Sequence, residues 1–147
     1  MIRIQAVHKK QYPELLAVWE ASVRATHHFL SKADIAFLKP LILERYFDAV
    51  DLRYAVDENN RVLGFVGVAE DKIEMLFIAP EHRGKGIGTL LTDHAVRQQG
   101  ATRVDVNEQN PQAVGFYHHL GFRTAGRSAT DGQGKPFPLL HLELRRT

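Results

Sequence analysis

The sequence has no cysteine, which excludes disulfide bonds, thiolate metal sites, iron–sulfur clusters and a cysteine nucleophile. It has no apolar run that approaches the length of a membrane span, and its first residues alternate in polarity instead of forming a signal-peptide core. The 19 basic and 17 acidic residues leave a net charge of only +2, too small to argue for nucleic acid. We therefore expect a cytoplasmic protein with no membrane and no nucleic-acid partner.

The length and composition are those of one folded domain. The chain has 147 residues, 44% of them hydrophobic and 24% charged, close to the averages for globular proteins. Short segments of alternating or mostly apolar residues predict strands. These segments are 2–6, 52–56, 62–69, 73–78, 103–106, 122–130 and 137–144. The second, third and fourth should form an antiparallel meander.

Helical spacing of apolar residues predicts four helices between these strands. Their first turns begin near Tyr12, after Ser31, at Ile87 and at Pro111. Pro40 lies inside the second helix, so we expect a kink or two short pieces there. Strands and helices in this order predict a mixed α/β layer fold.

A glycine-rich loop between a strand and a helix is the most informative segment. Gly84, Gly86 and Gly88 alternate with other residues and let backbone N–H groups approach a ligand closely. The following helix N-terminus adds unpaired donors, and Arg83 and Lys85 add charge, so the loop predicts a pyrophosphate site. It is neither a dinucleotide-binding nor a Walker A motif, because the required spacing fails. The alternative is a tight turn without a ligand, which rarely needs three glycines and two cations.

Two motifs resemble the GNAT N-acetyltransferase superfamily. The loop fits its (Gln/Arg)-x-x-Gly-x-(Gly/Ala) signature with Arg83-Gly84-Lys85-Gly86-Ile87-Gly88. A later segment, from Asn110 to Phe122, resembles its Asn-x-x-Ala-x-x-Phe-Tyr-x-x-x-Gly-Phe pattern. The resemblance covers residues 73–122 by motif and the whole chain by element order. The opening helix, from Trp19 to Leu30, further resembles small bacterial YjaB-type acetyltransferases.

The resemblance implies a fold and a function. The fold is α/β (α+β): a single GNAT domain over residues 1–147, with a mixed, mostly antiparallel sheet of about seven strands flanked by four helices. Strands four and five should splay apart, helped by a bulge. The implied activity moves an acetyl group from acetyl-CoA to a primary amine by direct attack in a ternary complex. The acceptor is a small-molecule amine or a protein lysine or N-terminus, and the family allows a homodimer.

The resemblance also implies a cofactor site. Loop amides of residues 83–89 would hold the coenzyme A pyrophosphate, and the backbone of Ile78 would pair with pantetheine. The N–H near Leu76 would face the thioester oxygen, and Asn110 would contact the pantetheine or phosphate portion. The implied set is Leu76, Phe77, Ile78, Arg83, Gly84, Lys85, Gly86, Ile87, Gly88, Thr89, Asn110 and Tyr117.

Acetyl transfer needs an acid for the leaving thiolate and a neutral amine. Tyr117 occupies the family's position for the acid, although its spacing alone favours a core aromatic. Glu74 is a candidate base, because it would share a face with Leu76 and Ile78 if that strand is regular; the alternative is an ordinary exposed residue.

The junction between the first two helices holds further candidates. There His27, His28 and Phe29 are candidate substrate contacts. Either histidine could instead be the base, or simply a packed or exposed side chain.

No metal-binding pattern is present, and the adjacent His118 and His119 cannot share one helical face, so we expect no metal. A second function stays open: a GNAT-fold module that binds or senses acyl-CoA without turnover, which fold alone cannot exclude. The presence of Tyr117 and Glu74 favours chemistry.

Overall fold

The structure is a computed structural model that describes residues 1–27, 30–132 and 134–144. In these residues seven strands form one sheet in the order β1-β2-β3-β4-β5-β7-β6. The strands are β1 (Arg3–Ala6), β2 (Asp51–Val56), β3 (Val62–Ala69), β4 (Lys72–Ile78), β5 (Arg103–Asn107), β6 (Phe122–Ser128) and β7 (Leu139–Leu144). The α-helices are α1 (Tyr12–Thr26), α2 (Lys32–Leu41), α3 (Ile87–Gln98) and α4 (Pro111–His119). The expected mixed sheet with four helices, and the antiparallel meander β2–β3–β4, are confirmed.

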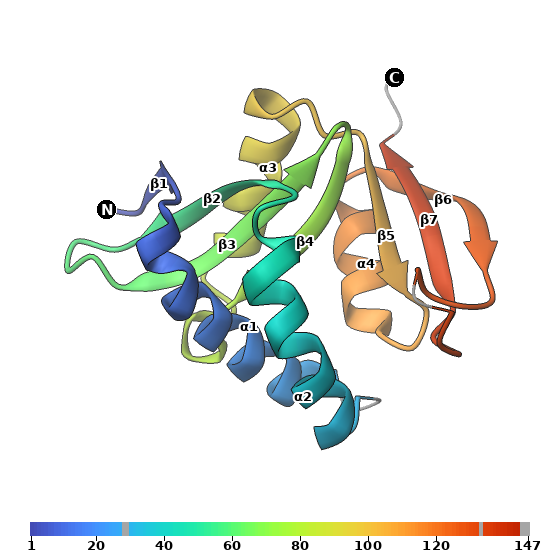
Figure 1. The fold of residues 1–147 in the computed structure, drawn as a ribbon. Helices are drawn as coiled ribbons and strands as arrows, with labels where there is room; N and C mark the ends of the chain where they lie inside the picture. The colour runs from blue at the N-terminus through green and yellow to red at the C-terminus, as the bar shows by residue number, and fades with distance from the viewer. Residues whose placement is uncertain (28–29, 133, 145–147) are drawn as a thin grey trace.

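Helices cover the sheet on two faces, and each face has its own core (Figure 1). On one face α1 and α2 contribute Leu15, Trp19 and Ile35 to a cluster against β2 and β3. On the other face α3 and α4 contribute Leu91 and Tyr117 to a second cluster. The 3.6-residue spacing of apolar residues in α1 and α3 predicts one buried stripe on each helix, and that stripe is buried in the structure.

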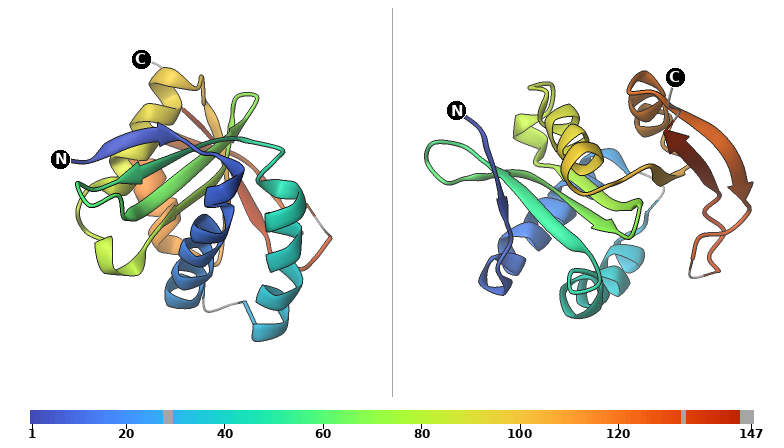
Figure 2. Two further views of the ribbon diagram at one scale, coloured as in Figure 1. Left: turned by 60° about the vertical axis from the view of Figure 1, so that its left-hand side comes forward. Right: turned by 90° about the horizontal axis from the view of Figure 1, so that it is seen from above.

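The sheet is nearly divided between β4 and β5. These two strands are parallel and pair through only two residue pairs, Lys72 with Arg103 and Ile73 with Val104. Beyond that point they diverge, and Figure 2 shows β5, β6, β7 and α4 leaning away from the rest when viewed from above. The expected splay between the fourth and fifth strands is confirmed.

A β-bulge sits in β4 where the divergence begins. Val68 pairs with Ile73 while its neighbour Gly67 pairs with Met75, so Glu74 is the extra residue. The strand is therefore not regular at Glu74, so the condition under which Glu74 was expected on the face of Leu76 and Ile78 is not met. A bulge depends on how two strands pair, which the residues of one strand do not reveal.

The remaining differences are at element ends, and prolines explain most of them. Ser31 caps α2 as expected: its hydroxyl accepts from Asp34 N at 3.0 Å. Pro40 lacks an N–H, and shortly after it the α-helix passes into a π-helical turn at Ile42–Tyr46. The last strand begins at Leu139 instead of residue 137, directly after Pro138, which cannot donate to a ladder.

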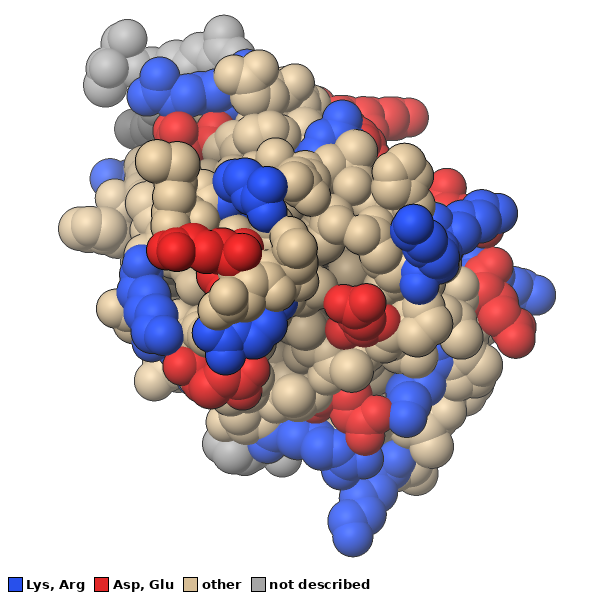
Figure 3. All heavy atoms as spheres, turned by 90° about the vertical axis from the view of Figure 1, so that its left-hand side faces the viewer, with Lys and Arg blue, Asp and Glu red and all other residues tan. Residues whose placement is uncertain are grey.

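Charges on the surface over β1 are mixed in sign. Figure 3 shows basic and acidic side chains interspersed on this face, without a continuous patch of either. Among the described residues, none of the helices combines the length and the apolar character that crossing a bilayer requires.

Candidate functional site

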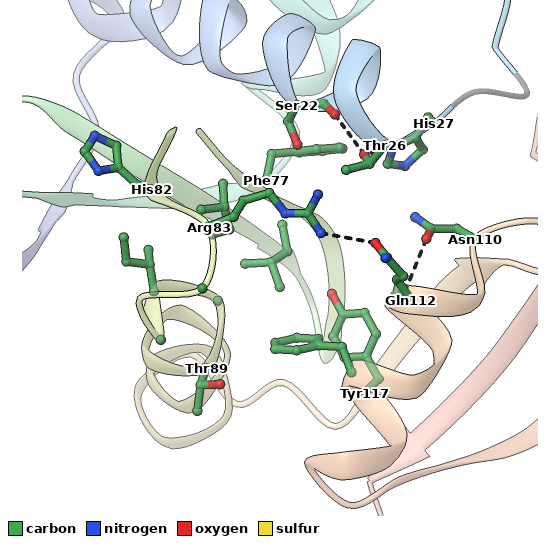
Figure 4. A pocket seen from close by; sticks show the side chains of 18 residues that line it. Ser22, Thr26, His27, Phe77, His82, Arg83, Thr89, Asn110, Gln112 and Tyr117 are labelled. Carbon is green, nitrogen blue, oxygen red and sulfur yellow. Dashed lines mark hydrogen bonds between the residues drawn. The ribbon is translucent and has the colours of Figure 1, made fainter. Parts of the chain in front are cut away.

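A cavity of about 420 Å³ opens where β4 leaves β5. Its walls come from the end of α1, the end of β4, the glycine-rich loop, the start of α3 and the inner side of α4 (Figure 4). It therefore gathers both segments that carry the sequence motifs. The lining residues are Ser22, Thr26, His27, Leu76, Phe77, Ile78, His82, Arg83, Gly84, Gly86, Ile87, Gly88, Thr89, Asn110, Gln112, Ala113, Phe116 and Tyr117.

The loop geometry suits an anionic ligand. Gly84 and Gly86 have φ values of +78° and +79°, and a Cβ built on either would meet no atom within 4 Å. Only glycine adopts this conformation without strain, and its backbone stays open to a ligand. Gly86 is the N-cap of α3, and no side chain caps this end. The first N–H groups of the helix are thus free for phosphate oxygens, with the helix dipole in their favour.

The end of β4 presents backbone donors to the gap. Ala79 N donates to Leu63 O of β3 at 2.9 Å. In an antiparallel ladder the N–H groups of one strand point alternately toward and away from the partner. Those of Leu76 and Ile78 therefore point away from β3, toward the side where β5 has diverged. An extended ligand arm with amide groups could pair there as an added strand does.

Tyr117 stands at the centre of the site. Its side chain is 6% exposed, and Figure 4 shows the hydroxyl pointing into the cavity. Burial raises the pKa of this phenol above its ordinary value, so the group keeps its proton at neutral pH. A buried, protonated hydroxyl directed into a cavity can act as a proton donor.

A smaller cavity of about 130 Å³ also has Tyr117 in its wall. The two cavities adjoin, because they share His27, Leu76, Phe77, Asn110, Ala113 and Tyr117. The smaller cavity's own walls come from the bulged part of β4 and from β5. The residues found only here are Ile73, Glu74, Met75, Val104, Asp105, Val106 and Asn107.

Two carboxylates in the smaller cavity have opposite pKa shifts. Desolvation raises the pKa of Glu74, although much of its side chain is exposed. Burial alone would also raise the pKa of Asp105, but hydrogen bonds from His141 and Lys72 outweigh it and hold that pKa below its ordinary value. Neighbouring carboxylates whose environments separate their pKa values commonly have different roles.

His27 is held by its neighbour in α1. The Thr26 hydroxyl donates to Ser22 O at 2.8 Å, and His27 Nδ1 lies 2.7 Å from the same hydroxyl oxygen. Because the only hydroxyl proton is used, Nδ1 must be the donor, and in a neutral ring the lone pair is on Nε2. The other two candidates at this junction, His28 and Phe29, lie outside the described residues.

Most of the implied cofactor residues lie together around the larger cavity, but Lys85 lies outside it and the side chain of Asn110 also caps a helix. Lys85 is not among the lining residues; its ammonium lies 3.2 Å from His82 Nδ1 on the exposed side of the loop. Asn110 lines both cavities, but its side-chain oxygen accepts from Ala113 N at 3.2 Å and so caps α4. Among the described residues there is no group of three or more side chains suited to hold a metal.

Several residues that line the site were not predicted from the sequence. Ser22, Thr26, His82, Gln112 and Phe116 line the larger cavity. Asp105 and Asn107 line the smaller one. The signal for Asp105 and Asn107 was their alternation with Val104 and Val106 along β5, which places both on the polar face.

Comparisons with known proteins agree with this geometry. A family model described as an acetyltransferase (GNAT) domain matches residues 26–137. The peptidyl-lysine N-acetyltransferase YjaB of Salmonella typhimurium is 42% identical, with 97% of each chain covered.

Solved structures resemble the chain as well. The solution structure of YjaB from Escherichia coli superposes with a TM-score of 0.87 at 39% identity, covering 100% of this chain and 99% of that one. The PaiA N-acetyltransferase of Thermoplasma acidophilum, solved with coenzyme A, has the same fold, with a TM-score of 0.77 at 20% identity and 99% of each chain covered. The chain belongs to the GNAT family of N-acetyltransferases.

Proposed function

We propose that the protein transfers the acetyl group of acetyl-CoA to the ε-amine of lysine in a polypeptide. The observation that carries this proposal is the position of Tyr117, which forms a wall of both cavities. The larger cavity has the phosphate-binding loop, and the smaller one has carboxylates suited to an amine. The name of the YjaB relatives, peptidyl-lysine N-acetyltransferase, supports a polypeptide acceptor over a small amine.

In this proposal the larger cavity holds acetyl-CoA. The amides at the start of α3, with Arg83, take the pyrophosphate, and the backbone of Leu76 and Ile78 takes the pantetheine arm. When bound, acetyl-CoA supplies an acyl carbon activated by its thioester. The structure fits such a ligand, because the loop is open above Gly84 and Gly86 and the helix end has no side-chain cap.

Each chemical step of the proposed transfer is then assigned to a residue. Glu74 accepts a proton from the acceptor ammonium, which is needed because a lysine amine has an ordinary pKa of about 10.4. The Leu76 N–H donates to the oxygen on which charge develops as the C–N bond forms. Tyr117 gives its proton to the sulfur as the C–S bond breaks, and the proton that the nitrogen loses on forming the amide restores the phenol. His27 is the second candidate for the base, since it lines both cavities.

The test uses two peptides that differ in one kind of amine. One has an acetylated N-terminus and a single lysine; the other has a free N-terminus and arginine in place of lysine. We expect thiol release and a mass gain of one acetyl group with the first peptide only. Acetylation of the second peptide alone would make the protein an N-terminal acetyltransferase. Binding of acetyl-CoA without thiol release on either peptide, or on small amines, would favour a non-catalytic sensor.

The expected cytoplasmic location and the homodimer stay predictions. Size-exclusion chromatography with light scattering tests the homodimer directly.

A further inference from the structure

A polar ladder crosses four strands at the base of the splay. It consists of Lys72 on β4, Asp105 on β5, His141 on β7 and Ser128 on β6. Lys72 Nζ donates to Asp105 Oδ2 at 2.7 Å, and His141 Nδ1 lies 2.7 Å from Asp105 Oδ1. His141 Nε2 lies 2.6 Å from Ser128 Oγ. All four side chains are half-buried.

The ladder sits where the two halves of the sheet are joined. Asp105 is paired directly opposite His141 across β5 and β7. Lys72 belongs to one of the two residue pairs that connect β4 to β5. The ladder therefore fixes the Asp105 carboxylate from both halves of the sheet, at the edge of the smaller cavity.

The Asp105 carboxylate is held in place but can still accept further hydrogen bonds. Each of its oxygens has one partner in the ladder, whereas an ionised carboxylate can accept about four hydrogen bonds. Glu74 lines the same cavity and makes no hydrogen bond to another described residue. One carboxylate is thus fixed with acceptor capacity to spare, while the other is free to move and to change its protonation.

We propose that Asp105 is the fixed anion that recognises the ammonium group of the acceptor lysine, and that Lys72 and His141 are positioning residues that act through it. This inference rests on the proposed lysine acetyltransferase function. The two carboxylates have different roles: Asp105 attracts and orients the lysine ammonium, and Glu74 accepts a proton from that ammonium. The apolar walls, including Val104, Val106 and Met75, suit the four methylene groups that carry a lysine ammonium.

The pKa of Glu74 gives a second readout of the Asp105 charge, because it depends on the charged groups around Glu74. Lys72 on its own strand and Arg103 on β5 lower the pKa of Glu74, whereas Asp105 raises it. His27 lines the same cavity. Replacing Asp105 with a neutral residue should therefore move the acidic limb of the rate profile to lower pH.

The decisive experiment compares a charged with a neutral acceptor. Asp105→Asn keeps the shape of the side chain and removes its charge. The acceptors are a lysine peptide and the same peptide with an aminooxy group in place of the ε-amine, which is uncharged at neutral pH. We expect KM for the lysine peptide to rise about tenfold and KM for the aminooxy peptide to change less than about twofold. An equal rise for both peptides, or no rise for either, would overturn the proposal.

Asp93→Asn is the matched control, because Asp93 forms an exposed ion pair with Arg97 on α3. Acetyl-CoA affinity should be unchanged in both variants. A wild-type protein that acetylates neither peptide would contradict the proposed function itself, which separates that failure from failure of the inference.

A second pair of variants tests the ladder without touching the cavity wall. His141→Leu removes the donor to Asp105, whereas the side-chain amide of His141→Asn can still donate. We expect the leucine variant to raise KM for the lysine peptide several-fold, and the asparagine variant to restore most of the wild-type value. Equal KM values in the two variants would show that His141 does not act through Asp105.

Discussion

The guanidinium of Arg83 donates to the side-chain oxygen of Gln112 at 3.2 Å, from the glycine-rich loop to α4 (Figure 4). Both residues line the larger cavity, so this bond joins its two walls. A phosphate group bound at the loop would compete with Gln112 for the same donor. Because phosphate carries charge and the amide does not, the exchange favours the ligand.

Gln112→Glu should weaken acetyl-CoA binding. The new carboxylate would hold Arg83 as an ion pair and place negative charge where the phosphates approach. We expect Kd, measured by calorimetric titration, to rise about tenfold, which is about 1.4 kcal/mol. Gln98→Glu, an exposed change in the last turn of α3, supplies the same added charge as a control. Unchanged affinity in Gln112→Glu would mean that Arg83 does not contact the phosphates.

Gly86→Ala should impair both stability and cofactor binding, and Gly100→Ala only stability. The two glycines have φ values of +79° and +73°, and neither has an atom within 4 Å of the added methyl group. Each alanine should therefore cost about 1–2 kcal/mol of unfolding free energy through the left-handed conformation. Only Gly86 lies in the cavity. Equal acetyl-CoA affinity in the two variants would rule out this loop as the phosphate site.

Tyr117→Phe should lower kcat while leaving the acetyl-CoA Kd nearly unchanged. Loss of a general acid costs about a hundredfold or more in rate. Because burial raises the pKa of the phenol, the wild-type enzyme should show no alkaline loss of activity from this group up to about pH 10. Tyr12→Phe is the control, since its hydroxyl bonds Asp48 far from the cavities. Full turnover in Tyr117→Phe would remove the acid from the mechanism.

Glu74→Gln should abolish the acidic limb of the kcat/KM profile. The base must be deprotonated to accept a proton, so activity falls as pH drops through the pKa of Glu74. Desolvation raises that pKa, and the limb should therefore lie at higher pH than an ordinary glutamate would give. We expect a rate loss of about a hundredfold on the plateau. If the limb persists in Glu74→Gln and disappears in His27→Asn, the base is His27.

Two glycine substitutions should change stability in opposite directions. An added Cβ at Gly64 would lie 2.8 Å from Phe77 O, a backbone atom of the paired strand β4 that cannot move freely. Gly64→Ala should therefore destabilise the protein by about 1–3 kcal/mol. Gly115 lies in α4 with nothing within 4 Å, and Gly115→Ala should stabilise by about 0.5–1 kcal/mol. Urea denaturation of both variants measures the difference.

The helices, the strands and the glycine-rich loop could be predicted because they depend on local signals. Helical spacing, turn residues and the glycines of residues 84–88 each act over a few neighbouring positions. The splay between the fourth and fifth strands followed from family resemblance and not from these signals. The end of the second helix was harder, since Pro40 removes a hydrogen bond without determining how the chain compensates.

Apart from Glu74 and His27, the smaller cavity could not be predicted, because it depends on pairing between distant strands. The bulge at Glu74 exists only relative to β3, and the ladder through Asp105 and His141 joins residues 36 positions apart. The sequence of β5 does place Asp105 on a polar face. Nothing in the chain near Asp105 indicates that Lys72 and His141 would hold it.

The two residue pairs between β4 and β5 leave part of the β4 edge without a strand beside it. An amide-bearing ligand in the gap would supply the missing hydrogen bonds, and it would bind the folded chain but not the unfolded one. By mass action such a ligand stabilises the fold by about 2.7 kcal/mol at a hundredfold excess over its Kd. Resistance of this protein to heat and proteolysis should therefore follow the acetyl-CoA concentration around it, so that the supply of donor sets the lifetime of the enzyme as well as its rate.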